Sequence, residues 1–488
     1  MPETVLMNAT TSYQLAIPAA MQSCFEHQRA AHLAAPESSH AQRIEDLKKL
    51  AQMLKDNREG LVEAVNLDYG SRSTFETLFA EYFALLDDLK STTKHLKKWM
   101  KPQRRKIDLM VYPTSSNRVI PQPLGVVGVI VPWNFPLMLS FAPLIGIFAA
   151  GNRAMLKMSE NSNHLARLLI AITPKYFPPE KLQFFEDGGG LGPAFSSLPF
   201  DHLFFTGSGQ TGRAVMANAA RNLTPVTLEL GGKSPAVVGP DYPMGLAADR
   251  IMWSKAFNAG QICINIDYAF IPAGTEADFE REAQRVIVER YPDINHSDYT
   301  SLIDQRAYDR IQASLDDAIV KGARVVNLFP GQVPNKALRK FPLHLIFNVS
   351  DDMIVMQREI FGPLLPVKTY TSKEEVARHI NQQDRPLALY PFTNDRALQD
   401  YYVSHTMSGG VSINNALLHV AQHDLPFGGV GGSGMGQYHG YEGFLTFSKL
   451  RPVYRQGFFA ATKFMLPPYD KGPLKPNALI ELLIKLKS

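Results

Sequence analysis

The sequence predicts an α/β protein of more than one domain, and three observations support this fold class. The chain has 488 residues, which is longer than one compact core normally organises, so two or three domains are expected. Apolar strand-like runs alternate with helical patterns through residues 126–230 and again through residues 236–366. A glycine-rich turn from Gly207 to Gly212 joins a strand-like run to a helix-like run. Together these features indicate parallel sheets covered by helices on both faces.

The first elements along the chain are expected to be amphipathic helices, because apolar residues recur at helical spacing through residues 41–65. Strands are then expected at residues 126–131, 154–157, 203–205 and 226–230, with helices at residues 164–173 and 212–220. In the second block, strand-like stretches occupy residues 269–272, 324–328 and 364–369. Two alternating blocks of this kind predict two α/β domains.

Residues 123–151 are almost wholly apolar and are long enough to cross a bilayer. The segment is interrupted by Pro132, Pro136 and Pro143, and Asn134 lies near its centre. Because a bilayer would leave the freed backbone groups unsatisfied, we expect a buried strand, a proline-bounded loop and a buried helix instead. The helix-like residues 478–487 are too few and too basic to span a membrane, so no membrane span is expected.

Three segments lie outside these regular patterns. Residues 107–122 and 444–454 have extended character and predict strands of an arm that lies away from the two cores. The glycine cluster at residues 188–192 predicts a flexible loop.

The composition is that of an ordinary soluble globular protein, with 45% hydrophobic residues, 20% charged residues and a formal net charge of +4. The basic residues at positions 97–106 are interpreted as a solvated helix end or linker, and no nucleic-acid binding is expected. The two cysteines, Cys24 and Cys263, are too few for a disulfide scaffold or a four-cysteine metal site. Residues 1–20 lack a basic region followed by a continuous apolar stretch, so no secretory signal is expected and the cytoplasm is the default location.

The turn Gly207-Ser-Gly209-Gln-Thr-Gly212 has the spacing of a dinucleotide-binding loop. Glycine allows a backbone to approach a pyrophosphate at the N-terminus of a helix, where the helix dipole favours negative charge. In an ordinary dinucleotide fold, Glu229 would stand where the ribose-binding acid lies, 17 positions after Gly212. The alternative is a tight strand-to-helix turn that binds no ligand.

Cys263 is the candidate nucleophile. A lone cysteine is usually a small buried hydrophobic residue, and Cys24 keeps that interpretation. Cys263 differs because Gly260 frees the backbone before it, Glu229 offers a base and Asn134 offers an amide donor elsewhere in the chain. His419 and His423 stand one helical turn apart but lack a third ligand, so no metal site is expected.

Seven motifs, read in order, resemble the aldehyde dehydrogenase superfamily across residues 43–451. They are Pro132-Trp-Asn-Phe-Pro136, Lys157-Met-Ser-Glu160, Phe205-Thr-Gly-Ser208, Glu229-Leu-Gly-Gly-Lys-Ser-Pro235, Gly260-Gln-Ile-Cys263, Glu359-Ile-Phe-Gly-Pro363 and Pro426-Phe-Gly-Gly429. Within the superfamily, residues 414–436 and the phrase Pro386-Leu-Ala-Leu-Tyr390 resemble the class 3 branch, and more narrowly its bacterial coniferyl aldehyde dehydrogenases.

The resemblance implies a Rossmann-type cofactor domain, an α/β catalytic domain and a β-strand oligomerisation arm. It assigns residues 1–104 and 124–229 to the dinucleotide-binding domain and residues 230–441 to the catalytic domain. It assigns residues 105–123 and 442–456 to the arm, and leaves residues 457–488 as a C-terminal extension. The arm matches the family's dimerising strands, so a homodimer is expected.

The resemblance also implies roles for individual residues. Cys263 becomes the nucleophile, Asn134 and the amide of Cys263 become the oxyanion donors, and Glu229 becomes the general base in place of a ribose ligand. The resemblance implies that the cofactor site includes Trp133, Lys157, Glu160, Gly207, Ser208, Gly212, Glu359 and Phe361. Lys157 and Glu160 would contact the adenosine ribose, Ser208 the pyrophosphate, and Glu359 and Phe361 the nicotinamide ribose and ring. The loop after Ser208 departs from many relatives, which carry a bulkier or acidic residue there.

The expected reaction is the NAD(P)-dependent oxidation of an aldehyde to a carboxylic acid through a cysteine thiohemiacetal and thioester. A free thiol is only about 3% ionised at pH 7, so Cys263 needs help from Glu229 or from the nicotinamide cation. Glu229 favours hydrolysis of the thioester over transfer of the acyl group to coenzyme A. Glu160 favours NAD over NADP, because a carboxylate repels a 2′-phosphate.

The expected substrate is a hydrophobic aromatic aldehyde such as coniferyl aldehyde, which would be oxidised to ferulate. A medium- or long-chain aliphatic aldehyde is the alternative substrate. A catalytically silent homologue with a structural role is the alternative from another class, although the complete set of catalytic residues argues against it.

Overall fold

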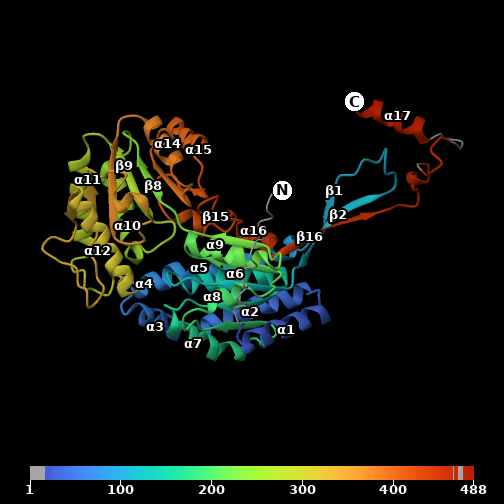
Figure 1. Ribbon diagram of the computed structural model, residues 1–488, viewed down its shortest axis with the longest axis horizontal. Helices are drawn as coiled ribbons and strands as arrows, with labels where there is room; N and C mark the ends of the chain where they lie inside the picture. Colours follow the sequence, from blue (N-terminus) through green and yellow to red (C-terminus); the bar gives the residue numbers. More distant parts are fainter. Residues whose placement is uncertain (1–16, 465, 471–475) are drawn as a thin grey trace, which may run out of the picture.

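The fold contains two large, mostly parallel sheets and one narrow sheet that projects away from them (Figure 1). The computed structural model describes residues 17–464, 466–470 and 476–488. The three sheets have six, seven and three strands, and each large sheet is surrounded by helices.

The six-stranded sheet forms the first α/β unit. Its strands, in spatial order, are β15 (Gly434–Met435), β7 (Val226–Glu229), β6 (His202–Thr206), β3 (Val126–Ile130), β4 (Arg153–Lys157) and β5 (Leu182–Phe185). All neighbouring pairs are parallel except β15 and β7. The short strand β15 comes from late in the chain, within the segment predicted to belong to the catalytic domain.

Helices cover both faces of this sheet, as expected for a parallel sheet. They are α1 (Ala19–Ala34), α2 (His40–Asp56), α3 (Arg58–Tyr69), α4 (Thr74–Thr77), the π-helix η1 (Leu78–Phe83), α5 (Ala84–Trp99), α6 (Met138–Ala150), α7 (Asn163–Ile172), η2 (Thr173–Lys175), α8 (Leu191–Ser196) and α9 (Gly209–Ala220). Alternate residues of β3 enter different cores, because Val127 and Val129 pack with α2 and α6 while Val126 and Ile130 pack with α1, α8 and α9.

The seven-stranded sheet forms the second α/β unit. Its order is β10 (Arg324–Asn327), β11 (His344–Phe347), β12 (Leu364–Tyr370), β9 (Ile266–Pro272), β8 (Ser234–Val238), β13 (Ala388–Phe392) and β14 (Gly410–Val411), with only β10 antiparallel to its neighbour. Its helices are α10 (Met244–Ala256), η3 (Phe257–Gly260), α11 (Glu276–Arg290), α12 (Gln305–Val320), α13 (Ile354–Gln357), α14 (Lys373–Gln382), α15 (Arg396–His405) and η4 (Leu418–Ala421).

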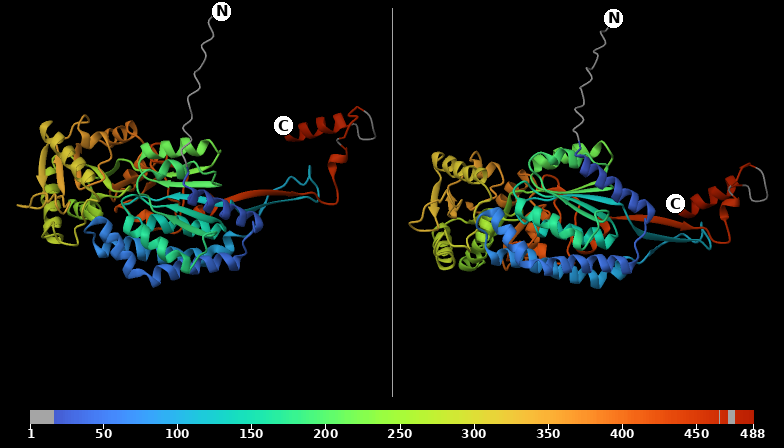
Figure 2. Two further views of the ribbon diagram at one scale, coloured as in Figure 1. Left: turned by 60° about the horizontal axis from the view of Figure 1, so that its bottom comes forward. Right: turned by 90° about the horizontal axis from the view of Figure 1, so that it is seen from below.

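The third sheet is an arm made of β1 (Gln103–Arg105), β2 (Ser116–Pro123) and β16 (Ser448–Arg455), all antiparallel. Helix α16 (Gly440–Thr446) leads into it, and η5 (Ala461–Phe464) and α17 (Pro476–Lys487) follow it. Figure 2 shows the arm leaving the body as a narrow ribbon with α17 beside its outer part, and Lys487 of α17 bonds Asp108 of the arm.

The predicted α/β fold class is confirmed, and most predicted elements are present. The apolar segment at residues 123–151 contains the buried strand β3, a loop and the buried helix α6, which includes Pro143. Among the described residues, none of the helices combines the length and the apolar character needed to cross a membrane.

Three element predictions need correction. Residues 107–115 form turns rather than strand, and β2 begins only at Ser116. The predicted strand at residues 444–454 begins at Ser448, because Phe444 belongs to α16 and packs its buried ring against Trp99. The glycine cluster at residues 188–192 is a loop only in its first part, since α8 begins at Leu191 and includes Gly192.

Candidate active site

A cavity of about 260 Å³ gathers most of the predicted site residues from both large sheets. It is lined by Trp133 and Asn134 after β3, Gly207 and Ser208 after β6, Glu229 at the end of β7, Cys263 before β9, and Glu359 and Phe361 before β12. Parallel sheets commonly place ligands at the carboxyl ends of their strands, which is where the residues following β3, β6 and β7 lie. The cavity therefore combines the glycine-rich turn with the candidate nucleophile.

The segment before Cys263 has an unusual backbone. Asn258, Ala259 and Gly260 have φ values of 50°, 48° and 77°, which lie in the left-handed region. Two non-glycine residues there cost roughly 1–2 kcal/mol each, so surrounding contacts must hold the turn. At Gly260, a Cβ atom would lie 2.4 Å from the carbonyl oxygen of Gly362, so a side chain cannot be accommodated.

Asn258 supplies part of the stabilisation of this turn. Its buried side-chain amide donates to the carbonyl oxygens of Asn134 at 3.2 Å and Gln261 at 3.0 Å. Its backbone N–H donates to the carboxylate of Glu76 at 3.0 Å, and burial raises the pKa of Glu76 to about 7. The turn at residues 258–260, called the nucleophile turn below because it precedes the candidate nucleophile, is thus bonded to Glu76 in α4, to Asn134 and to Gln261.

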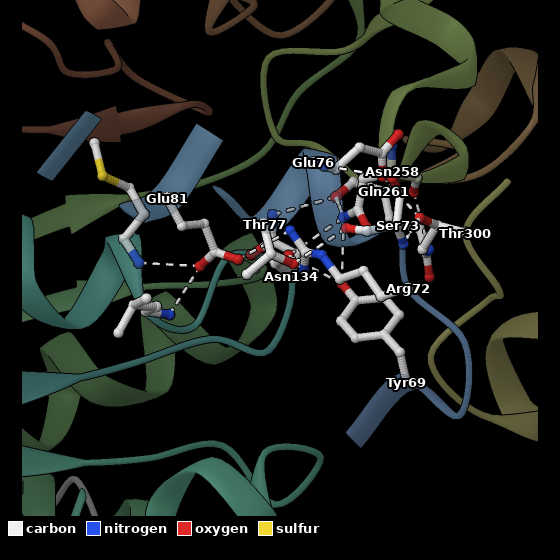
Figure 3. A network of polar contacts seen from close by, with 12 residues as sticks. Tyr69, Arg72, Ser73, Glu76, Thr77, Glu81, Asn134, Asn258, Gln261 and Thr300 are labelled. Atoms are coloured by element: carbon white, nitrogen blue, oxygen red, sulfur yellow. Dashed lines mark hydrogen bonds and ion pairs between the residues drawn. The ribbon is translucent and has the colours of Figure 1, made fainter. Parts of the chain in front are cut away.

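Asn134 is fixed through its main chain, as Figure 3 shows. Its carbonyl oxygen accepts hydrogen bonds from the Arg72 guanidinium at 2.7 Å and the Tyr69 hydroxyl at 2.9 Å, in addition to the bond from Asn258. Its side-chain amide makes only a long contact of 3.4 Å to the carbonyl oxygen of Gln261. The amide therefore remains available to a ligand in the cavity.

Arg72 is in turn held by Glu81, and both side chains are fully buried (Figure 3). Their charged groups lie 3.0 Å apart, and the second carboxylate oxygen of Glu81 accepts from the backbone N–H groups of Leu137 and Met138. Burial raises the pKa of Glu81, which the neighbouring Arg72 opposes. This ion pair links the start of α6 to the loop that carries Asn134.

Glu229 is a buried carboxylate without a visible partner. It is 3% exposed, and neither oxygen has a hydrogen-bond partner among the described residues. Burial raises the pKa of Glu229 well above its ordinary value. A carboxylate in this state binds a proton readily, which suits a general base next to a nucleophile or a water molecule.

Cys263 is partly buried in the cavity wall. Burial and the carboxylates of Glu359 and Glu229 raise the pKa of its thiol to about 12. At pH 7 only about one thiol in 10⁵ would be ionised at such a pKa. The charge of Glu229 therefore opposes thiolate formation, and Glu229 can assist only by accepting the proton.

A hydrogen bond to Asp267 holds the loop that carries Glu359 and Phe361. The N–H of Ile360 donates to Asp267 at 2.9 Å, and Asp267 pairs with Lys233. Burial, followed by the charge of Asp267, raises the pKa of Glu359 to about 8. A Cβ at Gly231 would lie 2.0 Å from the Glu359 carboxylate, so a side chain at position 231 would displace this carboxylate from its present position.

The glycine-rich turn connects β6 to the N-terminus of α9. Ser208 caps α9 by accepting from the N–H of Thr211 at 3.2 Å, and it is exposed at the cavity edge. A Cβ at Gly207 would meet the Phe205 ring at 2.6 Å, whereas one at Gly212 would meet Leu230 at 2.7 Å. Gly212 thus serves helix-to-strand packing, and it does not line the cavity.

Lys157 and Glu160 also lie outside the cavity lining. Lys157 is buried at the end of β4, where its ammonium group lies 2.5 Å from Asp187. Glu160 is exposed three residues further on.

The residues present fit a dinucleotide. The N-terminus of α9 attracts phosphate, the Glu359 carboxylate can accept from ribose hydroxyls, and Phe361 with Trp133 offers aromatic faces.

A second cavity, of about 180 Å³ and mostly apolar, lies beside the first. Its wall includes Phe257, at the start of the nucleophile turn, and Leu417. The hydroxyl of Tyr390 donates to the carbonyl oxygen of Ile264 at 2.6 Å and also bonds the backbone of Leu417. Tyr390 therefore connects the residue after Cys263 to the wall of the second cavity.

The two histidines of the predicted pair have different surroundings. His423 lies 2.7 Å from Asp87, whereas His419 packs its buried ring against Tyr390 and Phe427. Within the described ranges, no cluster of three or more His, Cys, Asp or Glu residues could hold a metal ion.

Sequence reasoning missed the residues that position the site, chiefly Tyr69, Arg72, Glu81, Asn258 and Arg310. Arg310 lines the cavity and donates to the carbonyl oxygen of Phe361 at 3.3 Å, where φ is 50°. Charged residues within a largely apolar stretch, such as Glu81, could have signalled such roles, but nothing in the sequence alone shows which backbone groups Arg72 and Glu81 bind.

Comparison with known proteins gives a consistent result. The aldehyde dehydrogenase family model matches residues 4–453, which extends the resemblance well before residue 43. A Pseudomonas aeruginosa protein named "Probable coniferyl aldehyde dehydrogenase" is 49% identical over 454 residues, covering 93% of this chain and 94% of its own. "Coniferyl aldehyde dehydrogenase" of a Pseudomonas species is 43% identical, covering 92% of this chain and 94% of its own.

Solved structures show the same fold. The structure titled "Substrate bound state of Staphylococcus Aureus AldH" superposes with a TM-score of 0.88 at 32% identity, covering 95% of this chain and 99% of that chain. An aldehyde dehydrogenase of Mycobacterium tuberculosis, described as complexed with NAD+, gives a TM-score of 0.81 at 24% identity and covers 92% of both chains. From the family match and these relatives, we conclude that the chain belongs to the aldehyde dehydrogenase family.

Proposed function

We propose that this enzyme oxidises an aldehyde to a carboxylic acid, with NAD or NADP as hydride acceptor and Cys263 as nucleophile. The observation that carries the proposal is the single cavity that contains Cys263, Asn134, the unpartnered Glu229 and the residues suited to a dinucleotide. Bound NAD would supply the hydride acceptor, and all other functions come from the chain itself.

Cys263 attacks the carbonyl carbon of the aldehyde, and the thiol proton leaves toward Glu229. The oxygen of the resulting thiohemiacetal carries developing negative charge, which the Asn134 amide stabilises by donating a hydrogen bond. One well-placed donor of this kind is worth roughly 10²–10³ in rate. Loss of hydride from the former carbonyl carbon leaves a thioester on Cys263.

Glu229 first releases the thiol proton to solvent and then takes a proton from a water molecule that attacks the thioester. Collapse of the tetrahedral intermediate breaks the carbon–sulfur bond and releases the acid, and the proton held by Glu229 returns to the departing thiolate. The lack of hydrogen-bond partners at Glu229 supports this role, because both oxygens are free to bind water. The presence of this base favours hydrolysis over acyl transfer to coenzyme A.

Within the cofactor site, we propose that Trp133, Glu359 and Phe361 hold the nicotinamide end and Gly207 and Ser208 the pyrophosphate. Lys157 and Glu160 would contact the adenosine ribose, and Gly212 supports the turn through packing. The carboxylates of Glu160 and Asp187 both favour NAD, because each would repel a 2′-phosphate. The specificity constants for NAD and NADP test this preference, which a clear advantage of NADP would overturn.

We further propose an aromatic substrate, with coniferyl aldehyde as the best candidate. Two relatives carry that name, and the second cavity has aromatic walls that include Phe79, Phe83 and Trp253. Phe79 and Phe83 stack at a centroid distance of 6.4 Å and stay partly exposed, so they offer ring faces to an entering aryl group.

An assay of NADH formation across a panel of aromatic and aliphatic aldehydes tests the proposed activity and substrate class. The largest kcat/KM is expected for coniferyl aldehyde. A preference for medium- or long-chain aliphatic aldehydes would favour the alternative substrate, and no NADH with any aldehyde would favour a silent homologue.

Two further proposals concern assembly and location. The arm of β1, β2 and β16 extends away from the body. An edge strand of this narrow sheet is suited to pair with a second copy of the chain, which would form a homodimer. A monomeric mass in solution would contradict the dimer. A reducing compartment, the cytoplasm, suits a catalytic thiol that must stay free, and both cysteines are free in the structure.

A further inference from the structure

The second cavity is apolar except at one group of side chains on its wall. Asp87 and Asp88 on α5 and His423 and His439 on the late loops line it together with Gln422, whose side-chain amide donates to the carbonyl oxygen of Leu418. The rest of the lining is apolar and includes Phe79, Phe83, Trp253 and Phe257. Asp87 and His423 satisfy each other at 2.7 Å and are partly exposed. Asp88 and His439, by contrast, are only 7% and 9% exposed.

Asp88 and His439 each have a side-chain atom without a hydrogen-bond partner among the described residues. Oδ1 of Asp88 accepts from the Thr92 hydroxyl at 3.2 Å, and no hydrogen bond within the described part of the chain engages Oδ2. Nε2 of His439 is buried and lacks a partner among the described residues. Its ring is fixed by stacking on Phe427 at a centroid distance of 5.4 Å.

The ionisation of both groups suits them to bind a hydroxyl. Burial raises the pKa of Asp88 to about 6, so at neutral pH it is mostly a carboxylate and accepts hydrogen bonds. Burial and the neighbouring His423 and His419 lower the pKa of His439 to about 3, so its imidazole is neutral. An unsatisfied acceptor in an apolar cavity costs free energy unless a ligand bonds it.

Buried Tyr438, which precedes His439, relates the polar group to the catalytic residues. It interacts electrostatically with Glu229, Cys263 and Asp88. Met138, four residues after Asn134, and Phe257, six residues before Cys263, also line the second cavity. One elongated molecule could therefore place an aldehyde at Cys263 and its distal end near Asp88.

We propose that Asp88 and His439 are specificity-determining residues that bind a hydroxyl group on the aryl ring of the aldehyde, at the end remote from the carbonyl carbon. The inference rests on the proposed aldehyde oxidation and deepens it by naming the substrate class, hydroxylated aryl aldehydes. The hydroxyl donates its one hydrogen to the free oxygen of Asp88 and accepts from the Nε2–H of neutral His439, while the aromatic wall holds the ring. A site with buried polar groups rejects the analogue that lacks the hydroxyl, because those groups are then left unpaired.

The test compares kcat/KM for 4-hydroxycinnamaldehyde and cinnamaldehyde, which differ only in the ring hydroxyl. The parent enzyme should prefer the hydroxylated aldehyde by about 10- to 100-fold, as expected for a hydrogen bond to a charged group. In Asp88→Asn, which keeps the shape and an oxygen for Thr92, this ratio should fall at least fivefold. Asp87→Asn makes the same charge change one residue earlier and should keep the ratio, because that carboxylate is already paired with His423.

If Asp88→Asn does not fold, His439→Phe provides the same test, because the ring can still stack on Phe427. A parent enzyme without preference for the hydroxylated aldehyde, or variants that lower kcat/KM equally for both aldehydes, would overturn the inference while leaving aldehyde oxidation intact.

If the parent enzyme oxidises neither aldehyde, the proposed function fails. In that case, calorimetry on Cys263→Ala tests the inference separately by measuring the affinity for each aldehyde. Tighter binding of the hydroxylated aldehyde, lost in Cys263→Ala/Asp88→Asn, would support it, and equal affinities would refute it.

Discussion

Replacing Glu229 by glutamine separates the two halves of the proposed reaction. The substitution keeps the side-chain shape and removes the base, so hydrolysis of the thioester should slow more than thiohemiacetal formation, because bound nicotinamide cation can still favour the Cys263 thiolate. A positioned general base contributes roughly 10²–10⁴ in rate, which corresponds to about 2.7–5.5 kcal/mol of activation free energy. Because both oxygens of Glu229 lack partners in the described structure, no neighbouring group can compensate for the loss.

Rapid mixing with an aromatic aldehyde and NAD measures this effect. Glu229→Gln should give a burst of about one NADH per active site, followed by a steady rate reduced at least 100-fold. Mass spectrometry of the quenched enzyme should find the acyl group on Cys263. A variant that turns over without burst, with unchanged deacylation, would refute the assignment of Glu229 as base.

The same variant has a predictable effect on stability. The pKa of Glu229 is higher in the folded chain than in the unfolded chain, where it lies near 4.3, because burial disfavours the charged form. The folded state therefore binds the proton more tightly, and the free energy of unfolding falls as pH rises from the unfolded value through the raised folded value. Glu229→Gln removes this titration, so its Tm relative to the parent should increase between pH 5 and pH 9. A Tm difference that is independent of pH would contradict the buried, unpartnered state of this carboxylate.

Three other substitutions follow from the geometry. Cys263→Ala should abolish oxidation while leaving the Kd for NAD within about threefold, and retained turnover would exclude Cys263 as nucleophile. Asn134→Ala should lower kcat/KM by roughly 10²–10³ with a Tm close to that of the parent, because the main-chain carbonyl of Asn134 keeps its three donors. Gly231→Ala would place a methyl group 2.0 Å from the Glu359 carboxylate, so NAD affinity measured by calorimetry should fall at least tenfold, and an unchanged Kd would show that Glu359 does not hold the cofactor.

The sequence sufficed for the fold class because strand and helix periodicities differ strongly in this chain. The segment containing β3 and α6 was predicted correctly, since prolines exclude a membrane helix and an apolar run before them suits a buried parallel strand. Strands β5, β11 and β13 were not predicted, because runs of four or five apolar residues do not distinguish strand from helix without their neighbours. The helical turn at Phe444 depends on packing against Trp99, a contact that no local pattern encodes.

The chemical groups of the site were predictable, whereas their support was not. Cys263, Asn134 and Glu229 stand in short motifs, and the structure places all three in one cavity. Lys157 and Glu160 stand in a motif as well, yet the structure places them outside that cavity and pairs Lys157 with Asp187. Arg72 lies in the loop between α3 and α4 and Glu81 in the π-helix η1, and only the tertiary structure shows that the two side chains form a buried pair near Asn134.

The left-handed turn at residues 258–260 has a consequence for the order in which the protein folds. This conformation is unfavourable locally, and the groups that compensate for it come from residues 69–76 near one end of the chain and from Asn134 in the first α/β unit. The turn precedes β9 in the second unit and all of these contacts come from the first unit, so the loop that carries Cys263 can reach its final conformation only after the two units have docked. Enzymatic activity should accordingly be the last property regained during refolding, later than helix content and later than the burial of tryptophan.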